Sequence, residues 1–264
     1  MPEGHTIHRH AATHRRLLAG HPLTVSSPQG RFGDGAAVLD GRRLERVEAW
    51  GKHEWLWFEG DAVLHVHLGL FGRWRKHPAG PPPEPRGQVR VRLHGPLGTT
   101  DLSGPTACEL GDPTDRDAVV ARLGPDPLRP DADPERFFDT LARSRRAVGL
   151  LLMDQSVIAG IGNVYRAEAL FVNGIWPLRT GRELGDDERR ALWDTVVRQL
   201  RAGVRSGRIV TVDRSEQPSA AGRGARGKAT YVYKREHCWR CGTPVARWDL
   251  AGRWCYACPS CQPS

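Results

Sequence analysis

The first residues of the chain, Pro2 and Glu3, are of types that could act together as a nucleophile and its proton-transfer partner. Removal of Met1 would leave Pro2 with a secondary amine, and an α-amino group titrates near about 7.7 to 8.0, against about 10.4 for Lys. A much larger fraction of this amine is therefore neutral and nucleophilic at pH 7. Attack on a sugar aldehyde carbon gives a permanently charged iminium, which makes the next C–O bond easier to break. Glu3 could supply or accept the proton that the attack requires.

The same two residues also have a plain structural interpretation. Proline is favoured at the first position of a helix, and an acidic residue there is stabilised by the helix dipole. Taken alone, Pro2 and Glu3 favour this structural interpretation. A catalytic role therefore depends on what the rest of the chain contains.

The end of the chain carries the strongest motif, because five of the six cysteines fall between residues 238 and 261. Cys238 and Cys241 form one C-x-x-C pair, and Cys258 and Cys261 form a second. Two such pairs suit a tetrahedral Zn²⁺ ion, and a site with four thiolates is closed and structural. Cys255 could instead pair with Cys258; we favour the first arrangement, with Cys255 as a spare thiol. One structural Zn²⁺ ion is therefore expected.

Four other features could contact a nucleic acid, and each is weak alone. Lys52 could bind a phosphate or move a proton, although a Lys at the end of a strand ordinarily does neither. The turn that ends in Asn163 could hold one phosphate at a helix N-terminus, or could simply cap that helix. Leu70 and Phe71 are expected to be buried unless they act as a wedge between bases. Arg253, on the finger, is well placed to meet a phosphate.

Composition narrows the class of partner. The 264-residue chain has a net charge of +9 and a pI near 9.7, which favours a polyanionic partner. Inflated Arg content from a GC-rich genome would give the same charge. No run of eighteen apolar residues and no secretory signal is evident, so we expect a cytoplasmic, nucleoid-associated protein without a membrane partner. Nothing demands more than a monomer.

The first half of the chain predicts one helix followed by strands. Ile7, Ala11 and Leu18 recur at helical spacing before Gly20, which predicts a helix from residue 3 to residue 18. Residues 23–110 contain short apolar runs broken by Gly, Pro and Asp, which indicate an antiparallel β-sandwich or a barrel. The clearest strands are Trp55–Phe58, Ala62–Leu68 and Gln88–Leu93, with an exposed loop at Pro78–Pro85.

The second half predicts helices and then the cysteine-rich finger. A Pro/Asp/Gly cluster at residues 124–134 indicates a boundary. Helices are expected around Phe137–Leu141, Leu150–Met153 and Val164–Phe171, and from an Asp186 cap to Gly207. Residues 213–229 are expected to form a mobile loop. The fold class is therefore α+β, with a catalytic β-sandwich domain and its leading helix at 1–130, a helical domain at 131–229 and a zinc finger β-hairpin at 230–264.

These segments together resemble the formamidopyrimidine-DNA glycosylase and endonuclease VIII family. The matching residues are Pro2-Glu3-Gly4, Lys52, Gly160 to Tyr165 in a helix-two-turn-helix, and the four-cysteine finger with Arg253. Met1 to Thr6 and His67 to Gly72 resemble the endonuclease VIII branch found in actinobacteria. The order and spacing of these segments make coincidence improbable.

The resemblance implies a bifunctional DNA glycosylase and apurinic/apyrimidinic (AP) lyase of base excision repair. It implies that Pro2 attacks C1′ of a damaged nucleotide and that Glu3 protonates the sugar-ring oxygen or the leaving base. Lys52 would assist β-elimination, and Arg253 would assist δ-elimination. Asn163 and Arg253 would grip phosphates, while Leu70, with Phe71, would fill the hole left by the extruded base.

One departure from the family pattern bears on the substrate. Glycosylases specific for oxidised purines carry an Arg-Phe pair on a later loop, whereas the corresponding stretch here, residues 101–106, contains neither. The resemblance therefore favours oxidised pyrimidines in double-stranded DNA, with single-stranded or bubble DNA left open. Two alternatives remain: a non-catalytic binder of damaged or single-stranded DNA, and a zinc-ribbon protein of the RNA or transcription machinery.

Overall fold

The computed structural model describes residues 2–216 and 229–263. The chain divides into two compact units, which we call unit 1 (residues 1–122) and unit 2 (residues 123–264) and describe separately. The predicted division into three domains stays a prediction. No helix within the described ranges is long and apolar enough to cross a membrane.

Unit 1 contains two four-stranded antiparallel sheets, ordered β1-β6-β7-β5 and β2-β3-β4-β8. This confirms the predicted helix followed by an antiparallel β-domain. Its elements are α1 (Gly4–Leu18), β1 (Thr24–Ser26), α2 (Gly33–Leu39), β2 (Leu44–Trp50), β3 (His53–Phe58), β4 (Ala62–His67), β5 (Arg73–His77), β6 (Val89–Gly95), β7 (Gly98–Ser103), β8 (Ala107–Gly111) and α3 (Pro113–Val120).

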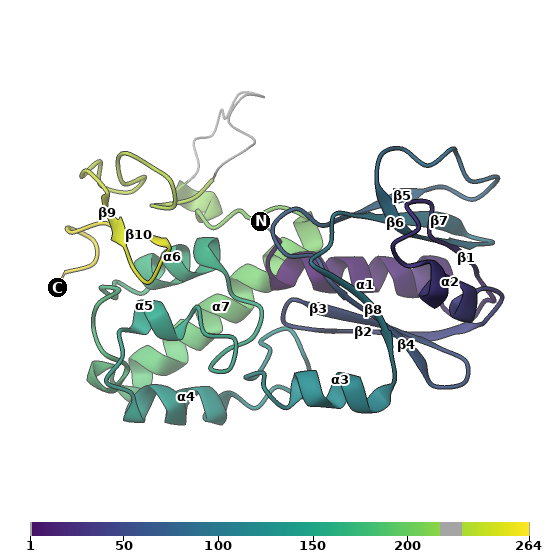
Figure 1. Cartoon of the computed structure of the whole chain (residues 1–264). Helices are drawn as coiled ribbons and strands as arrows, with labels where there is room; N and C mark the ends of the chain where they lie inside the picture. The colour runs from purple at the N-terminus through teal and green to yellow at the C-terminus, as the bar shows by residue number, and fades with distance from the viewer. Residues whose placement is uncertain (1, 217–228, 264) are drawn as a thin grey trace. The chain divides into compact units, whose positions relative to one another are not determined.

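Helix α1 is the centre of the unit 1 core. It runs between the two sheets in Figure 1 and packs against β2 and β3 of one sheet and β6 and β7 of the other. The predicted face of the helix, Ile7, Ala11 and Leu18, is buried. Helix α1 therefore contributes to the core from between the two sheets.

The two short helices of unit 1, α2 and α3, were not predicted. Helix α3 covers the outer face of the second sheet, where Trp55, Trp57 and Val63 form a small cluster with Val119 and Val120. Because α3 covers this face, β3 is buried on both faces and shows no regular alternation of buried and exposed residues. Eight residues are too few for a helical period to stand out in the sequence.

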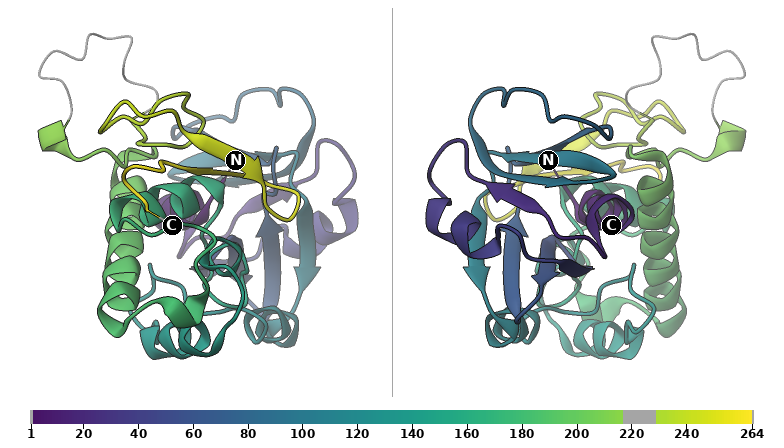
Figure 2. Two further views of the ribbon diagram at one scale, coloured as in Figure 1. Left: turned by 90° about the vertical axis from the view of Figure 1, so that its left-hand side faces the viewer. Right: turned by 90° about the vertical axis from the view of Figure 1, so that its right-hand side faces the viewer.

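Unit 2 contains a helical bundle and the finger, and Figure 2 shows the finger hairpin in yellow beside the green helices. Strand β10 contacts α6. The elements are α4 (Pro134–Arg143), α5 (Val148–Leu151), α6 (Asn163–Val172), the 3₁₀ turn η1 (Gly181–Glu183), α7 (Asp186–Ser206), the 3₁₀ turn η2 (Arg214–Glu216), β9 (Ala246–Asp249) and β10 (Trp254–Ala257).

Two helix starts differ from the prediction by one residue. Asn163 is the first residue of α6, with extended Gly162 as the cap, so Asn163 is inside the helix and does not precede it. Likewise Gly185 caps α7, and its N–H donates to Glu188 Oε2 at 2.8 Å, so Asp186 is not the cap. Gly207 ends α7 in the left-handed conformation, as expected. Most of the loop predicted at 213–229 lies outside the described residues.

Candidate active site and metal centre

The structure rules out the helix-starter interpretation of Pro2. Helix α1 begins at Gly4, and Glu3 is its N-cap residue, in extended conformation with its carbonyl accepting the Thr6 N–H at 2.8 Å. Pro2 therefore lies one residue before the cap, outside the position where proline favours a helix. The Glu3 side chain is 0% exposed and makes no capping hydrogen bond. A buried carboxylate thus adjoins the predicted nucleophile.

Lys52 lies in the tight turn between β2 and β3, where Trp50 pairs with His53. Gly51 has a φ of 59°, which permits this turn. The Lys52 side chain is half-buried.

A buried carboxylate two residues further on ties β3 to α1. Glu54 is 1% exposed; its Oε1 lies 2.7 Å from His14 Nδ1, and its Oε2 accepts the Trp74 indole N–H at 3.0 Å. His14 belongs to α1 and Trp74 to β5. One carboxylate therefore links three elements of unit 1, including the helix that follows Pro2 and the strand that follows Lys52.

The expectation that Leu70 and Phe71 are buried is wrong. Leu70 is 58% exposed and Phe71 is 83% exposed, in the turn between β4 and β5. Gly69 has a φ of +64°, and a Cβ there would lie 1.8 Å from Thr106 Oγ1. Unit 1 thus presents two large apolar side chains to solvent from a turn that only glycine can form.

The predicted phosphate-binding residues of unit 2 lie on adjoining segments. Arg253 is exposed in the turn between β9 and β10, and its carbonyl accepts the Leu250 N–H at 2.9 Å. Asn163 Nδ2 donates to the carbonyl of Trp254, the next residue, at 3.0 Å. The start of α6 is therefore hydrogen-bonded directly to the strand that follows Arg253.

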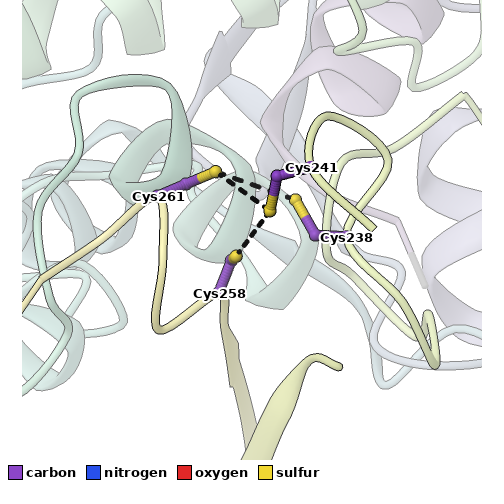
Figure 3. A group of neighbouring side chains, drawn as sticks. All are labelled: Cys238, Cys241, Cys258 and Cys261. Carbon is purple, nitrogen blue, oxygen red and sulfur yellow. Dashed lines mark hydrogen bonds between the residues drawn. The ribbon is translucent and has the colours of Figure 1, made fainter. Parts of the chain in front are cut away.

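The four predicted cysteine ligands converge in unit 2 (Figure 3). The sulfur atoms of Cys238, Cys241, Cys258 and Cys261 all lie within 4.8 Å of one another. The Sγ separations are 3.5 Å for Cys241 with Cys258, 3.5 Å for Cys241 with Cys261 and 4.0 Å for Cys238 with Cys261. Four sulfurs at about 2.3 Å from a tetrahedral Zn²⁺ are separated by about 3.8 Å, so the cluster fits one such ion.

Cys255 is not part of this cluster. It lies fully buried in β10, and burial raises the pKa of its thiol. The sulfur atoms that converge are those of Cys238, Cys241, Cys258 and Cys261. The structure therefore favours the predicted set over the alternative pair that contains Cys255.

Sequence reasoning also missed the buried carboxylate of Glu168, in α6. It accepts the backbone N–H groups of Tyr231 at 2.6 Å, Val232 at 3.0 Å and Tyr233 at 2.9 Å. Glu168 therefore anchors the segment that leads into the finger. An acidic residue inside the apolar run of residues 167–172 was the available signal.

The sequence-predicted residues are thus divided between the units. Pro2, Glu3, Lys52, Leu70 and Phe71 belong to unit 1. Asn163, Arg253 and the four clustered cysteines belong to unit 2. The residues predicted to do chemistry thus belong to unit 1, and the residues predicted to bind phosphate and metal belong to unit 2.

Comparison with known proteins identifies both units. Residues 1–104 match a family model described as the formamidopyrimidine-DNA glycosylase N-terminal domain. Residues 123–215 match one described as the formamidopyrimidine-DNA glycosylase H2TH domain.

Full-length relatives carry two kinds of name. The chain is 48% identical to Endonuclease 8 1 of Mycobacterium tuberculosis, covering 99% of this chain and 100% of that protein. It is 36% identical to the probable endonuclease 8 2 of Streptomyces coelicolor, over 99% and 94% of the two chains. It is 33% identical to the formamidopyrimidine-DNA glycosylase of Thermus thermophilus, over 99% and 97%.

Solved structures share the fold. The Lactococcus lactis formamidopyrimidine-DNA glycosylase, in complex with DNA containing an abasic site, superposes with a TM-score of 0.79 at 22% identity, covering 99% of this chain and 100% of that one. The same enzyme with DNA containing an N7-benzyl-Fapy-dG lesion gives a TM-score of 0.80 at 23% identity, covering 100% of both. With the matched domains and the full-length relatives, these findings show that the chain belongs to the formamidopyrimidine-DNA glycosylase and endonuclease VIII family of DNA repair glycosylases.

Proposed function

We propose that this protein is a bifunctional DNA glycosylase and AP lyase that removes oxidised pyrimidines. The observation that carries the proposal is the position of Pro2, which lies outside α1 and directly before the fully buried Glu3. Pro2 therefore does not occupy the first helical position, and the residue that follows it carries a buried carboxylate. The full-length similarity to Endonuclease 8 1 supports the same assignment.

The first step would be attack of the neutral Pro2 nitrogen on C1′ of the damaged nucleotide. The C1′–N glycosidic bond breaks, and the base leaves with the proton that the Pro2 nitrogen loses on attack. Glu3 protonates O4′ as the sugar ring opens, which yields an iminium between Pro2 and C1′. Because the Pro2 nitrogen is secondary, the iminium cannot lose its charge by deprotonation at nitrogen, and it remains an electron sink for the next step.

Elimination then cuts the strand. Loss of a proton from C2′ sends electrons toward the iminium and breaks the C3′–O3′ bond, and Lys52 assists this proton movement. Arg253 assists the δ-elimination that breaks the C5′–O5′ bond. Asn163 and Arg253 also contact the phosphates near the lesion.

The exposed side chains of Leu70 and Phe71 are suited to offset part of the free-energy cost of extruding the base. Attack at C1′ requires the damaged nucleotide to leave the stack, and an apolar side chain inserted into the gap offsets part of the lost stacking. The turn built on Gly69 holds the two side chains in solvent before DNA binds. We propose that Leu70 fills the gap, with Phe71 beside it.

The preference for oxidised pyrimidines is supported by the segment at residues 101–106. It lacks the Arg-Phe pair of the purine-specific enzymes. Asp101 instead accepts hydrogen bonds from Arg92 at 2.7 and 2.9 Å, so its carboxylate is engaged within the sheet. We propose a monomer that acts on damaged duplex DNA, with single-stranded and bubble DNA as further substrates to compare.

The four-cysteine cluster would hold one structural Zn²⁺ ion. Such an ion neutralises the thiolates and stabilises a finger too small to have a core of its own. The chain's own contribution is the hairpin that this cluster supports, with Arg253 at its turn. The ion has no role in the chemical steps.

Borohydride trapping tests the proposal. The chain with a C-terminal tag, from which Met1 is removed, should form a covalent adduct with DNA that contains thymine glycol or an abasic site. An N-terminal tag converts the Pro2 nitrogen to an amide, so this matched control should bind the same DNA without trapping or strand cleavage. Salt-dependent DNA binding by the chain with a free N-terminus, without an adduct or strand cleavage on any lesion, would instead favour a non-catalytic DNA binder.

Glu3→Gln separates the two activities. Base excision requires proton transfer to the sugar or base, whereas a ready-made abasic site lacks the base already. The variant should therefore lose excision of thymine glycol by at least about a hundredfold, because general acid catalysis contributes roughly 10² to 10⁴. Cleavage of abasic DNA should be much less affected. Equal loss on both substrates contradicts the role given to Glu3.

A further inference from the structure

A buried arginine connects the two phosphate-binding residues of unit 2. Arg166 belongs to α6, one helical turn after Asn163, and is 0% exposed. Because the side chain has no accessible surface, it cannot reach a DNA phosphate in this arrangement. Any influence on DNA binding must therefore pass through the groups that it contacts.

Those contacts lie on both segments that carry the proposed DNA contacts. Arg166 Nη2 donates to Asn163 Oδ1 and, at 2.8 Å, to the carbonyl of Trp254. Nη1 donates to the Gly149 carbonyl at a longer 3.4 Å. Asn163 Nδ2 donates to the same Trp254 carbonyl at 3.0 Å. The guanidinium, the Asn163 amide and the residue after Arg253 thus form one closed network.

This network determines which way the Asn163 amide points. Its oxygen is held by the guanidinium and one amide hydrogen by Trp254, so the second amide hydrogen has a defined direction. The Trp254 carbonyl accepts two N–H groups, which holds β10 against the start of α6. Arg253 directly precedes Trp254, so its backbone is next to a carbonyl that this network holds in place.

The shape of the guanidinium suits a geometric role. Nη2 donates to two uncharged oxygens, Asn163 Oδ1 and the Trp254 carbonyl. The planar guanidinium fixes the directions of its N–H groups, whereas the three N–H groups of an ammonium rotate at the end of a flexible stem.

We propose that Arg166 is a positioning residue that holds Asn163 and Arg253 in one arrangement, so that both contact phosphates of the same DNA strand. The inference rests on the phosphate roles given to these residues in the proposed function. Replacement of Arg166 should therefore remove phosphate contacts that Arg166 itself does not make.

The salt dependence of DNA binding measures this effect. The logarithm of the binding constant falls with the logarithm of salt concentration by about 0.9 per phosphate that a Lys or Arg neutralises in duplex DNA. Loss of the Arg253 contact should lower the slope by about 0.9, whereas loss of the contact from the neutral Asn163 amide should weaken binding at every salt concentration. From 50 to 200 mM salt, wild-type binding should then weaken about 3.5-fold more than that of a variant that lacks both contacts.

The test uses Arg166→Lys in the full zinc-loaded chain and a duplex with a tetrahydrofuran abasic analogue. Lysine keeps the charge, so a lower slope reports geometry and not net charge. Arg166→Lys should match the Asn163→Ala, Arg253→Ala double variant. Arg179→Lys is the control, because Arg179 also bridges several oxygens in unit 2, from Glu188 and the Glu183 carbonyl. Its slope should remain that of the wild type.

A double-mutant cycle separates positioning from general destabilisation. If Arg166 acts through Asn163, adding Asn163→Ala to Arg166→Lys should cost no further affinity, whereas independent effects would add. A wild-type slope for Arg166→Lys, or additive losses in the cycle, overturns the proposal. If Arg166→Lys binds less than one zinc per chain, Arg166→Met, which fills the same space without a charge, provides the comparison.

Borohydride trapping on abasic DNA keeps this inference distinct from the proposed function. The salt slope is a binding measurement that requires no chemistry, whereas trapping reports the iminium on Pro2. If the wild type forms no adduct, the proposed chemistry fails while the slope comparison still decides the role of Arg166.

Discussion

Unit 1 should lose stability steeply as pH falls below 6.5, because several of its histidines are held neutral by burial. Burial is the largest cause that lowers the pKa of His5 to about 4, of His10 to about 4 and of His53 to about 3, from an ordinary value of 6.5. Next to His53, burial also lowers the pKa of His65 and His67. His53 Nδ1 lies 2.9 Å from His65 Nε2, so these rings share one enclosed region.

The direction of the pH effect on the free energy of unfolding depends on whether the folded or the unfolded chain binds more protons. Above pH 6.5 these histidines are neutral in both the folded and unfolded chain, and they contribute nothing to the pH dependence. Below pH 6.5 the unfolded chain takes up protons that the folded chain does not, so the free energy of unfolding falls. The loss continues until the pH approaches the folded pKa values of about 3 to 4.

The magnitude at pH 5.5 can be worked from these values. Each histidine with an unfolded pKa of 6.5 and a folded pKa at or below about 4 costs about 1.4 kcal/mol at pH 5.5. His5, His10 and His53 together cost about 4 kcal/mol, and His65 and His67 add to the same loss. This is a large part of a typical domain stability of roughly 5 to 15 kcal/mol.

Hydrogen exchange of unit 1 peptides is the appropriate assay, because protonation of the cysteine thiolates in unit 2 would confuse a global signal. The opening free energy of β3 and β4 should fall by about 4 kcal/mol between pH 8 and pH 5.5, after correction for the intrinsic pH dependence of exchange. His53→Asn, which keeps a polar group near His65, should reduce that fall by about 1.4 kcal/mol. The reasoning is refuted if the opening free energy falls by less than about 1 kcal/mol, or if it falls equally in His53→Asn and in the wild type.

Three further perturbations have defined outcomes. Leu70→Ala should change stability by less than about 0.5 kcal/mol, because the side chain is 58% exposed. Its cleavage of abasic duplex should nevertheless fall at least about tenfold, and cleavage of single-stranded abasic DNA should fall less; equal losses on the two substrates contradict the gap-filling role. Gly69→Ala should destabilise unit 1 by at least about 1 to 3 kcal/mol in urea unfolding, since φ is +64° and the new Cβ meets Thr106; an unchanged midpoint disproves the strain. Zinc chelation should abolish DNA binding in an anisotropy assay while unit 1 peptides keep their exchange protection, and retained binding by the zinc-free chain argues against the finger as a DNA contact.

Local patterns in the sequence were sufficient to predict much of this protein's structure. The 3.6-residue period of Ile7, Ala11 and Leu18 predicts α1, and the turn-rich apolar runs predict the antiparallel sheets. The two C-x-x-C pairs predict the cysteine cluster. These features depend on residues close together in the chain, where backbone geometry and ligand spacing limit the possible structures.

Tertiary structure decided which polar groups meet and which apolar groups remain outside. Glu54 pairs with His14, 40 residues away, and Asn163 with Trp254, 91 residues away. Leu70 and Phe71 look like core residues by type, yet both are exposed in the turn that contains Gly69. A residue's type sets the cost of burying it, but only the packing of distant segments determines whether it is buried and which partner offsets that cost.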